Sequence, residues 1–350
     1  MQQPESTEVL ALTDIEQTAT SIADLQLSNG MILWMAGGHA DPWNHIEAAM
    51  ALAVAGRHVE AEAAYRWLAD VQDPAGTWHH YYLEDRIEDR KVDTNCCAYI
   101  ATGVLHHFLI TGDETFAHSM WPTVESALDF VVGLQSARGL IPWALHDDGK
   151  PWSYGLLTGS SSIHHSLLAG LELADALGKE RPMWELAAVR LGELIAHDED
   201  AFEPKQRWAM DWYYPVLSGA LDDEAAAARL EAGRDKFVLD DHGIRCVSDQ
   251  PWVTAAETCE CAMAYLSLAD LDSTHATEAR RLFDAVQVHR QDDDGAYLTG
   301  LVYPGDISFP DNECSTYTSA AIILAADALD RRTPASGLLI GEGLRDLRRR

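Results

Sequence analysis

The sequence predicts an all-α protein, namely an (α/α)6 barrel (an α/α toroid) of six helix pairs in a single domain. Helical segments that are apolar on every side alternate with amphipathic ones, a short junction motif recurs, and tight turns alternate with long loops. A helix that is apolar all round must be buried, whereas an amphipathic helix can face water. Six repeats of such a pair are typical of a closed ring, and an open α-solenoid is the alternative.

The helices are expected in alternation along the chain. The apolar inner helices are expected at residues 43–56, 94–112, 161–178, 211–221, 254–271 and 314–329. The amphipathic outer helices are expected at residues 13–27, 58–71, 113–134, 181–196, 222–238 and 273–288. These elements assign residues 1–335 to the barrel and leave residues 336–350 as a flexible C-terminal tail.

The junction motif lies between helix pairs. It reads Q-x-x-x-G with an apolar or aromatic residue two positions on, at residues 72–78, 135–141 and 291–297, and weaker copies occur at 28–32 and 240–245. The glycine can adopt a positive φ and turn the chain after a helix. Connections from inner to outer helices, such as residues 55–57 and 111–113, are short. The long loops therefore collect at the other end of the ring, where function is expected.

Charge and composition exclude several classes of partner. The 350 residues include 25 Lys and Arg against 56 Asp and Glu, a net charge of −31, which repels phosphate backbones and anionic lipids. Nucleic acids and membranes are therefore not expected as partners. No apolar stretch of about 18 residues and no signal-peptide pattern is present, so a cytoplasmic location is expected. The six cysteines fit neither a disulfide framework nor a zinc knuckle, and buried free thiols are expected.

Aromatic and acidic residues gather in the segments that lead into the inner helices. Eight of the eleven tryptophans lie there, and flat rings with one N–H donor suit the faces of sugars. Five acids stand near the expected starts of inner helices: Asp41, Asp93, Asp211, Glu257 and Glu313. Each alone is explained as a helix cap or as a first-turn acid. Together they are expected to converge, because these helices start at the same end of the ring.

Carboxyl groups near one axis suit a reaction that needs two carboxyls with different pKa values. Glycoside hydrolysis is such a reaction, since it uses one protonated acid and one ionised partner. Metal binding is the competing interpretation, but no H-x-x-x-H or H-E-x-x-H spacing occurs, so no metal is expected. No Walker loop or G-x-G-x-x-G motif follows a predicted strand, so no cofactor is expected either.

Two family resemblances add to these observations. The junction at residues 72–78 resembles the repeat of terpene cyclases and prenyltransferases, but the acidic D-x-D-D and D-D-x-x-D motifs of those enzymes are absent. Five strings resemble the methylmannose polysaccharide hydrolase family and related actinobacterial (α/α)6-barrel proteins often labelled prenyltransferase: residues 41–44, 159–163, 210–216, 245–249 and 251–259. This second resemblance implies inverting endo-hydrolysis of α-1,4-linked 6-O-methylmannose chains.

The resemblance also implies a catalytic pair, an Asp on the first loop and a Glu on a later inner helix, which correspond to Asp41 and Glu257. The polar neighbours of Asp41 would keep it ionised as the base, whereas the apolar neighbours of Glu257 would raise its pKa and suit the acid. Asp211 and Glu313 are the substitutes. The expected substrate-binding residues are Trp43, Asn44, Trp78, His79, Tyr81, Asp93, Asn95, His164, Asp211, Trp212, Tyr213, Arg245, Trp252 and Glu313.

The expected partner is a polysaccharide or oligosaccharide. Two alternatives stay open, namely a prenyltransferase or terpene-cyclase-like enzyme and a non-catalytic barrel that binds glycans. The sequence leaves the oligomeric state undetermined.

Overall fold

The computed structural model describes residues 8–344, and its longer helices form two sets. The first set is buried along most of its length, because small and apolar residues occupy every face. In α2, for example, every residue from Pro42 to Ala53 is buried. The first set comprises α2 (Pro42–Val54), α5 (Ile100–Thr111), α7 (Leu157–Ala176), α9 (Met210–Leu217), α11 (Ala255–Leu266) and α13 (Thr316–Asp330).

The helices of the second set bury only part of their surface. They are α1 (Leu12–Ala23), α3 (His58–Val71), α6 (Glu114–Gly133), α8 (Pro182–His197), α10 (Asp223–Phe237) and α12 (Ser273–Ala285). The short helix α4 (Thr94–Ala98) runs into α5, and the two together occupy the single helix predicted at 94–112. The predicted all-α class and the alternation of buried and amphipathic helices are therefore confirmed.

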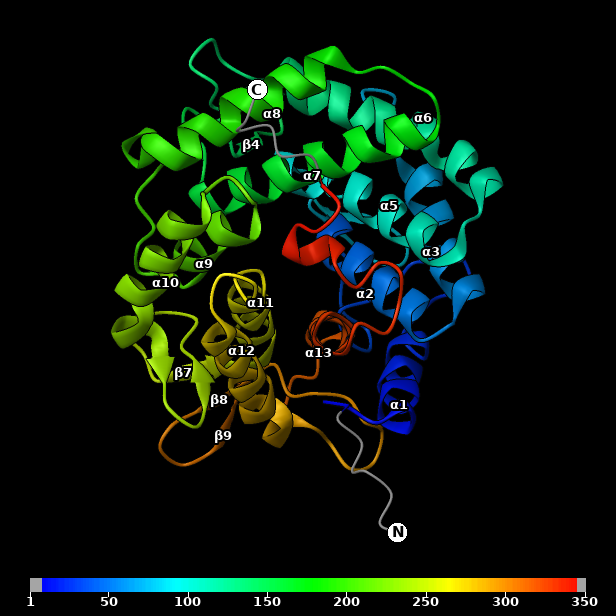
Figure 1. The fold of residues 1–350 in the computed structure, drawn as a ribbon. Coiled ribbons are helices and arrows are strands. Elements are labelled where there is room, and N and C mark those ends of the chain that lie inside the picture. The colour runs from blue at the N-terminus through cyan, green and yellow to red at the C-terminus, as the bar shows by residue number, and fades with distance from the viewer. Residues whose placement is uncertain (1–7, 345–350) are drawn as a thin grey trace.

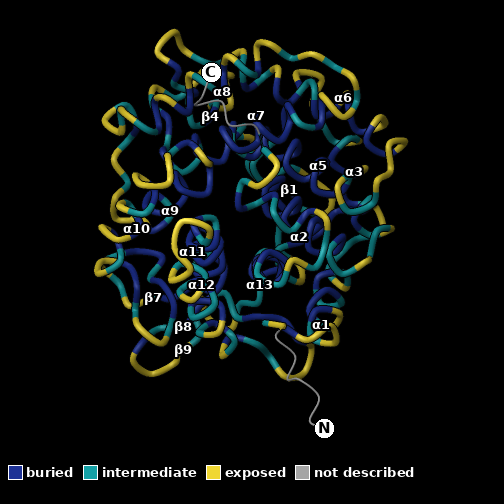
Figure 2. The backbone as a smooth tube through the Cα atoms, viewed as in Figure 1, coloured by how far each residue is buried: buried dark blue, intermediate teal, exposed yellow. Residues whose placement is uncertain are grey.

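The buried helices pack side by side in chain order. Contacts join α2 to α5, α5 to α7, α7 to α9, α9 to α11, α11 to α13, and α13 to α2. Figure 1 shows these helices around the centre and the second set outside them. In Figure 2 the buried positions follow the inner helices, and many of the exposed positions lie toward the periphery. Among the described residues, no helix combines the length and the apolar character that a bilayer crossing requires.

The two ends of this set of inner helices differ in their connections. At one end the chain passes from an inner to an outer helix in a few residues, and Gly56 and Gly112 adopt positive φ angles of 78° and 64° there, which other residues avoid. The loops at the other end carry short strands that pair antiparallel. These are β1 (Tyr81–Tyr82), β2 (Ile87–Asp89), β3 (Val92–Asp93), β4 (Ala144–Leu145), β5 (Val238–Leu239), β6 (Gly243–Ile244), β7 (Trp252–Thr254), β8 (Gly300–Val302) and β9 (Ile307–Phe309).

The junction motif is a clamp between neighbouring outer helices. The Gln72 side-chain amide donates to the carbonyls of Gly76 and of Thr123 in α6, at 3.2 and 3.0 Å. Gly76 (φ +86°) lies so close to α6 that a Cβ atom would come within 2.3 Å of the Ser126 carbonyl oxygen. The same contacts join residues 26–30 to Glu60 and Ala63 of α3, and residues 135–139 to Ala187 and Arg190 of α8. The weak copy predicted at 28–32 is therefore a complete one that begins at Gln26.

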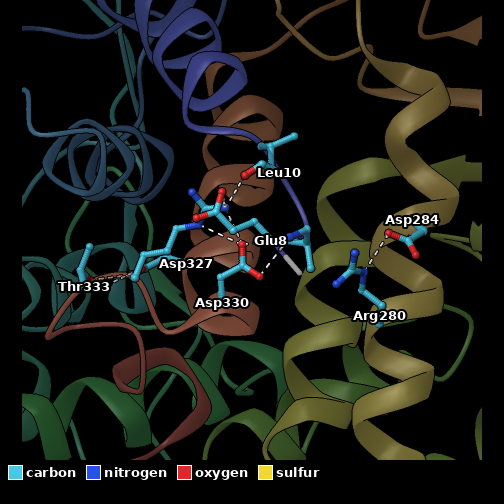
Figure 3. A network of polar contacts seen from close by, with 9 residues as sticks. Glu8, Leu10, Arg280, Asp284, Asp327, Asp330 and Thr333 are labelled. Carbon is cyan, nitrogen blue, oxygen red and sulfur yellow. Dashed lines mark hydrogen bonds and ion pairs between the residues drawn. The ribbon is translucent and has the colours of Figure 1, made fainter. Parts of the chain in front are cut away.

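The first described residues are tied to the end of α13. The Asp330 carboxylate accepts hydrogen bonds from the Val9 backbone N–H at 3.0 Å and pairs with Arg332, which also donates to the Leu10 carbonyl oxygen. Figure 3 shows this network, in which Asp327 also contacts Thr333. Val9 and Leu10 are thereby held beside the last inner helix, against which α1 packs.

The segment after residue 335 differs from the flexible tail that the sequence predicted. The 3-10 helix η3 (Leu338–Ile340) is placed against the inner helices, with Leu338 and Ile340 buried. Its Leu338 carbonyl oxygen lies 2.9 Å from His165 Nε2 of α7. Apolar side chains at 338 and 340 give this segment a buried position that its Gly- and charge-rich flanks do not suggest. Residues 345–350 lie outside the described residues.

The clamp makes a prediction about stability. Gly76→Ala should lower the free energy of unfolding by about 3 kcal/mol or more, since it combines a strained positive φ with a clash against the α6 backbone. The control is Gly149→Ala, which has a similar φ of 79° but nothing within 4 Å of the added carbon, and should cost about 1 kcal/mol. Urea unfolding measures both, and equal losses would contradict the clamp.

Candidate active site

Four of the five predicted acids stand at the starts of inner helices, at the end of the molecule that carries the long loops. Asp41 and Asp93 are the N-caps of α2 and α4, and Asp211 and Glu257 lie in the first turns of α9 and α11. Glu313 lies just before α13, where its carboxylate accepts a hydrogen bond from the Thr299 hydroxyl at 2.9 Å. We call the region around Asp41, Asp93 and Glu257 the mouth.

Asp41 is buried and is held by donors on both carboxylate oxygens. Its Oδ1 accepts the backbone N–H groups of Trp43 and Asn44 at 2.9 and 3.0 Å, as a helix cap does. Its Oδ2 accepts the indole N–H of Trp34 at 2.6 Å, a contact that capping does not require. Burial raises the pKa of Asp41, and these hydrogen bonds oppose the rise. The setting is thus less polar than the sequence suggested, and hydrogen bonds are what favour the ionised form.

Stacked rings surround this carboxylate. His39 and Tyr81 lie parallel with centroids 4.0 Å apart, and Trp34 meets His39 edge-on at 4.8 Å. Burial and the charge of Asp41 raise the pKa of Tyr81 to about 12. Trp34 was not among the predicted site residues, although its position in the first loop, seven residues before Asp41, was a signal for it.

Glu257 is partly exposed at the first turn of α11. Burial raises its pKa, and the neighbouring Thr254 hydroxyl and a backbone hydrogen bond oppose the rise. Thr254 is the N-cap residue, but its side chain makes no capping hydrogen bond, so this pair does not form the capping box that was the alternative explanation of Glu257. A carboxyl with a raised pKa holds its proton closer to neutral pH, as a general acid must.

A second pair of carboxyls lies one turn deeper. Glu260 accepts hydrogen bonds from Tyr213, from Tyr214 at 2.7 Å and from Tyr317 at 3.2 Å, and Glu47 accepts one from Tyr99. Burial first, and then the charge of Glu257, raise the pKa of Glu260 to about 8, while burial raises that of Glu47 to about 7. Both line a cavity of about 40 Å³ together with Trp43, His165 and Leu339. The sequence signal was an acid within an otherwise apolar stretch of an inner helix, Glu47 in α2 and Glu260 one turn after Glu257 in α11.

Three predicted site residues point away from the mouth. Trp78 is buried, and its indole donates to the Leu68 carbonyl at 2.8 Å. Trp212 donates to the Arg229 carbonyl at 2.8 Å and stacks on Phe237 of α10 with centroids 5.3 Å apart. His164 bonds to the Ser218 carbonyl, and its ring lies against Gly192 of α8. His164 and Trp212 fill the space between helices, because an inner helix also has an outward face, whereas Trp78 packs from its loop against the end of α3.

The other predicted residues have varied surroundings. Trp43 stacks on Tyr99 with centroids 4.8 Å apart, and Trp252 stacks on Phe309 at 4.5 Å. His79 Nδ1 lies 3.0 Å from the Arg90 carbonyl oxygen. Among the described residues, the buried atoms Asn95 Oδ1 and Arg245 Nε have no hydrogen-bond partner, so a ligand hydroxyl would satisfy either.

Three side chains near the mouth have the composition of a metal site. One ligand atom each of His80, Asp93 and Cys96 lies within 4.8 Å of the other two. The Asp93 carboxylate, however, already accepts backbone N–H groups of α4, and the Lys91 ammonium lies close enough to lower the pKa of Asp93. That positive charge disfavours the binding of a metal cation by these three side chains.

All six cysteines are free and five are buried, as predicted, while Cys314 is partly exposed.

A relative with a named activity matches nearly the whole chain. It is the MMP endo-(1,4)-3-O-methyl-alpha-D-mannosidase of Mycolicibacterium hassiacum, which is 48% identical over 336 residues, covering 96% of this chain and 91% of that protein. The chain belongs to the methylmannose polysaccharide hydrolase family. This confirms the resemblance found in the sequence. No protein-family model matches the sequence.

Solved structures share the fold of this hydrolase family member at low identity. A glycosidase variant in complex with glucose has a TM-score of 0.73 at 14% identity, covering 94% of this chain and 99% of its own. A D-mannose isomerase has a TM-score of 0.68 at 12% identity, with 93% and 99% coverage. A cellobiose 2-epimerase from Bacillus thermoamylovorans has 0.68 at 10%, with 91% and 99% coverage. At such identities the likeness concerns the fold alone.

The deep carboxyls predict how stability depends on pH. The folded state holds the proton of Glu260 up to about pH 8, whereas the unfolded chain releases it near pH 4.5. The free energy of unfolding should therefore fall as pH rises between these values, by about 1.4 kcal/mol per pH unit for this group. Glu260→Gln should remove that slope in urea unfolding at pH 5 to 8, and the exposed Glu193→Gln should not. Parallel wild-type and Glu260→Gln curves would contradict the burial of a neutral carboxyl.

Proposed function

We propose that the protein hydrolyses internal α-1,4 bonds of 3-O-methylmannose polysaccharide chains by inversion, with Glu257 as general acid and Asp41 as general base. The observation that carries the proposal is the near full-length identity to a named endo-mannosidase. The methyl position follows that relative's name, and so replaces the 6-O-methyl group that the sequence resemblance implied. We propose with it that the helix pairs form one closed (α/α)6 barrel, since α13 contacts α2.

The carboxyl environments support the division of roles. Burial raises the pKa of Glu257, so a protonated Glu257 can give its proton to the glycosidic oxygen as the bond to the anomeric carbon breaks. Asp41 takes a proton from a water molecule, whose oxygen forms the new bond on the opposite face of the sugar. Three N–H donors fix the Asp41 carboxylate and favour its charged form. Inversion requires the two carboxyls to lie about 6.5–9.5 Å apart, with the water between them.

The charge of the protein fits an uncharged substrate. With a net charge of −31, the surface repels an anionic ligand at low salt, whereas a methylated mannan has no charge to repel. Methyl ethers also add apolar surface to a sugar, and the aromatic rings near Asp41 offer matching surface.

The catalytic pair is tested by two isosteric variants. Asp41→Asn and Glu257→Gln should each lower kcat by about 10³-fold or more, because each removes a proton-transfer group. Melting temperatures should change little, and proton NMR of the first product formed by the wild type should show the β anomer. Residual turnover near the wild-type level in either variant, or an α anomer, would refute the assignment.

A second prediction concerns the hydrogen bond from Trp34. Trp34→Phe removes a donor that lowers the pKa of Asp41, so the base should ionise at higher pH and the acidic limb of kcat/KM should move up by about one pH unit. Trp78→Phe is the matched control, since it also loses an indole hydrogen bond, but one to the Leu68 backbone. Its pH profile should be unchanged, and a similar shift in both variants would show a general loss of structure instead.

A further inference from the structure

A cavity of about 630 Å³ opens between the segment that precedes α9 and the helices α9 and α10. Its volume suits a ligand of oligosaccharide size. The catalytic roles proposed above use no residue of its wall. The wall includes Tyr154, Glu199, Asp200, Glu203, Lys205, Trp208, Asp211, Trp212, Arg229, Lys236 and Phe237.

Trp208 is the aromatic residue of this wall that stands in solvent. It is 45% exposed, whereas Trp212 and Phe237 are buried. The Arg207 guanidinium lies over the Trp208 ring, 5.5 Å from its centroid, and is held there by an ion pair with Asp249. A supported, exposed indole at the edge of a cavity is the arrangement that stacks on a sugar face.

Aromatic rings lead from the mouth to this cavity. The Trp143 side chain hydrogen-bonds to Asp93, which caps α4. The centroids of Trp143 and Trp152 lie 4.7 Å apart, and those of Trp152 and Tyr154 lie 5.5 Å apart. Tyr154 then forms part of the cavity wall. A chain of sugars that leaves the mouth along these rings would reach Trp208.

The Trp208 backbone also connects the cavity wall to the segment around Cys246. The backbone of Trp208 pairs with Val247, and the next N–H, that of Ala209, donates to the Cys246 carbonyl at 3.0 Å. Burial and the nearby Glu257 raise the pKa of Cys246 to about 12. Trp208 therefore pairs with the segment that contains Cys246, whose pKa is raised in part by the charge of Glu257.

The charges of the wall fit a neutral ligand. The wall holds four acidic and three basic side chains, so neither an anion nor a cation is strongly favoured. Arg229 is already paired with Glu199, and the Lys236 ammonium donates to the Gln206 carbonyl oxygen. Aromatic surface with mixed polar groups is suited to hydroxyl-bearing, uncharged sugars.

We propose that this cavity is a second glycan-binding site, which holds sugar units of the same polysaccharide chain away from the bond that is cut. The inference rests on the proposed function and extends it, because it predicts that long chains are cleaved more efficiently than short ones.

The test compares kcat/KM on a long and a short α-1,4-linked 3-O-methylmannose oligosaccharide. Trp208→Ala should lower the ratio of long to short about tenfold, the effect of losing one stacking contact. Trp208→Phe, which keeps a flat ring, should retain most of the ratio. Leu271→Ala is the control, since Leu271 is 51% exposed at the opposite, tight-turn end of α11. Its ratio should equal that of the wild type.

The outcomes separate this site from the proposed function. Cleavage of both chains with the same ratio in the wild type and in Trp208→Ala would overturn the second site alone. An equal loss on long and short chains would also overturn it, since Trp208 would then act at the cut bond. Failure of the wild type to cleave or bind either chain in calorimetry would overturn the proposed function and the second site with it.

Discussion

The arrangement of this molecule depends on a repeated contact between neighbouring outer helices. In each clamp a glutamine amide bridges a glycine carbonyl and a carbonyl of the next outer helix, while the glycine lets the two backbones approach. Any side chain at Gly76 would separate them. A related contact joins Gly295 to α1, where the Thr18 hydroxyl donates to its carbonyl at 2.8 Å. The clamps set the spacing of the outer helices, and this spacing in turn fixes where the inner helices begin.

That constraint explains why acids accumulate at one end. Helices that begin together present their unpaired N–H groups together, and carboxylates are the natural partners of such groups. Asp41 and Asp93 are caps in this sense, but each also has an indole partner, Trp34 and Trp143, that a cap does not need. Below them, Glu260 is buried among tyrosines with a pKa of about 8. Burial thus raises the pKa of the carboxyls at the mouth, and N–H donors oppose the rise at Asp41 and Asp93.

Periodicity and composition predicted the helices well, because burial on all sides leaves a strong sequence signal. The outer helix predicted at 58–71 has the observed bounds of α3 (His58–Val71). Side-chain direction was predicted less well. A buried helix faces both the axis and its outer partners, so nothing in the sequence showed that His164 of α7 points outward. Trp78 lies in the loop after α3, and its indole turns back to the Leu68 carbonyl of that helix. Glu47 and the buried Leu338 were missed because their partners, Tyr99 and His165, lie far along the chain. Trp34 was missed although its partner Asp41 is only seven residues away.

The short helix α9 shows how a local irregularity produces a site. Pro215 has no N–H, so the Asp211 carbonyl lacks its normal helical partner, and the Arg229 side chain donates to it at 2.6 Å instead. Gly233 of α10 leaves room for the Trp212 indole, which a Cβ atom there would approach within 2.3 Å. Both contacts hold α9 against α10 and place Asp211 in the wall of the cavity of about 630 Å³ that contains Trp208. An acid that the sequence offered as a substitute for the catalytic pair therefore belongs to the surface on which we expect the distant part of the glycan to bind.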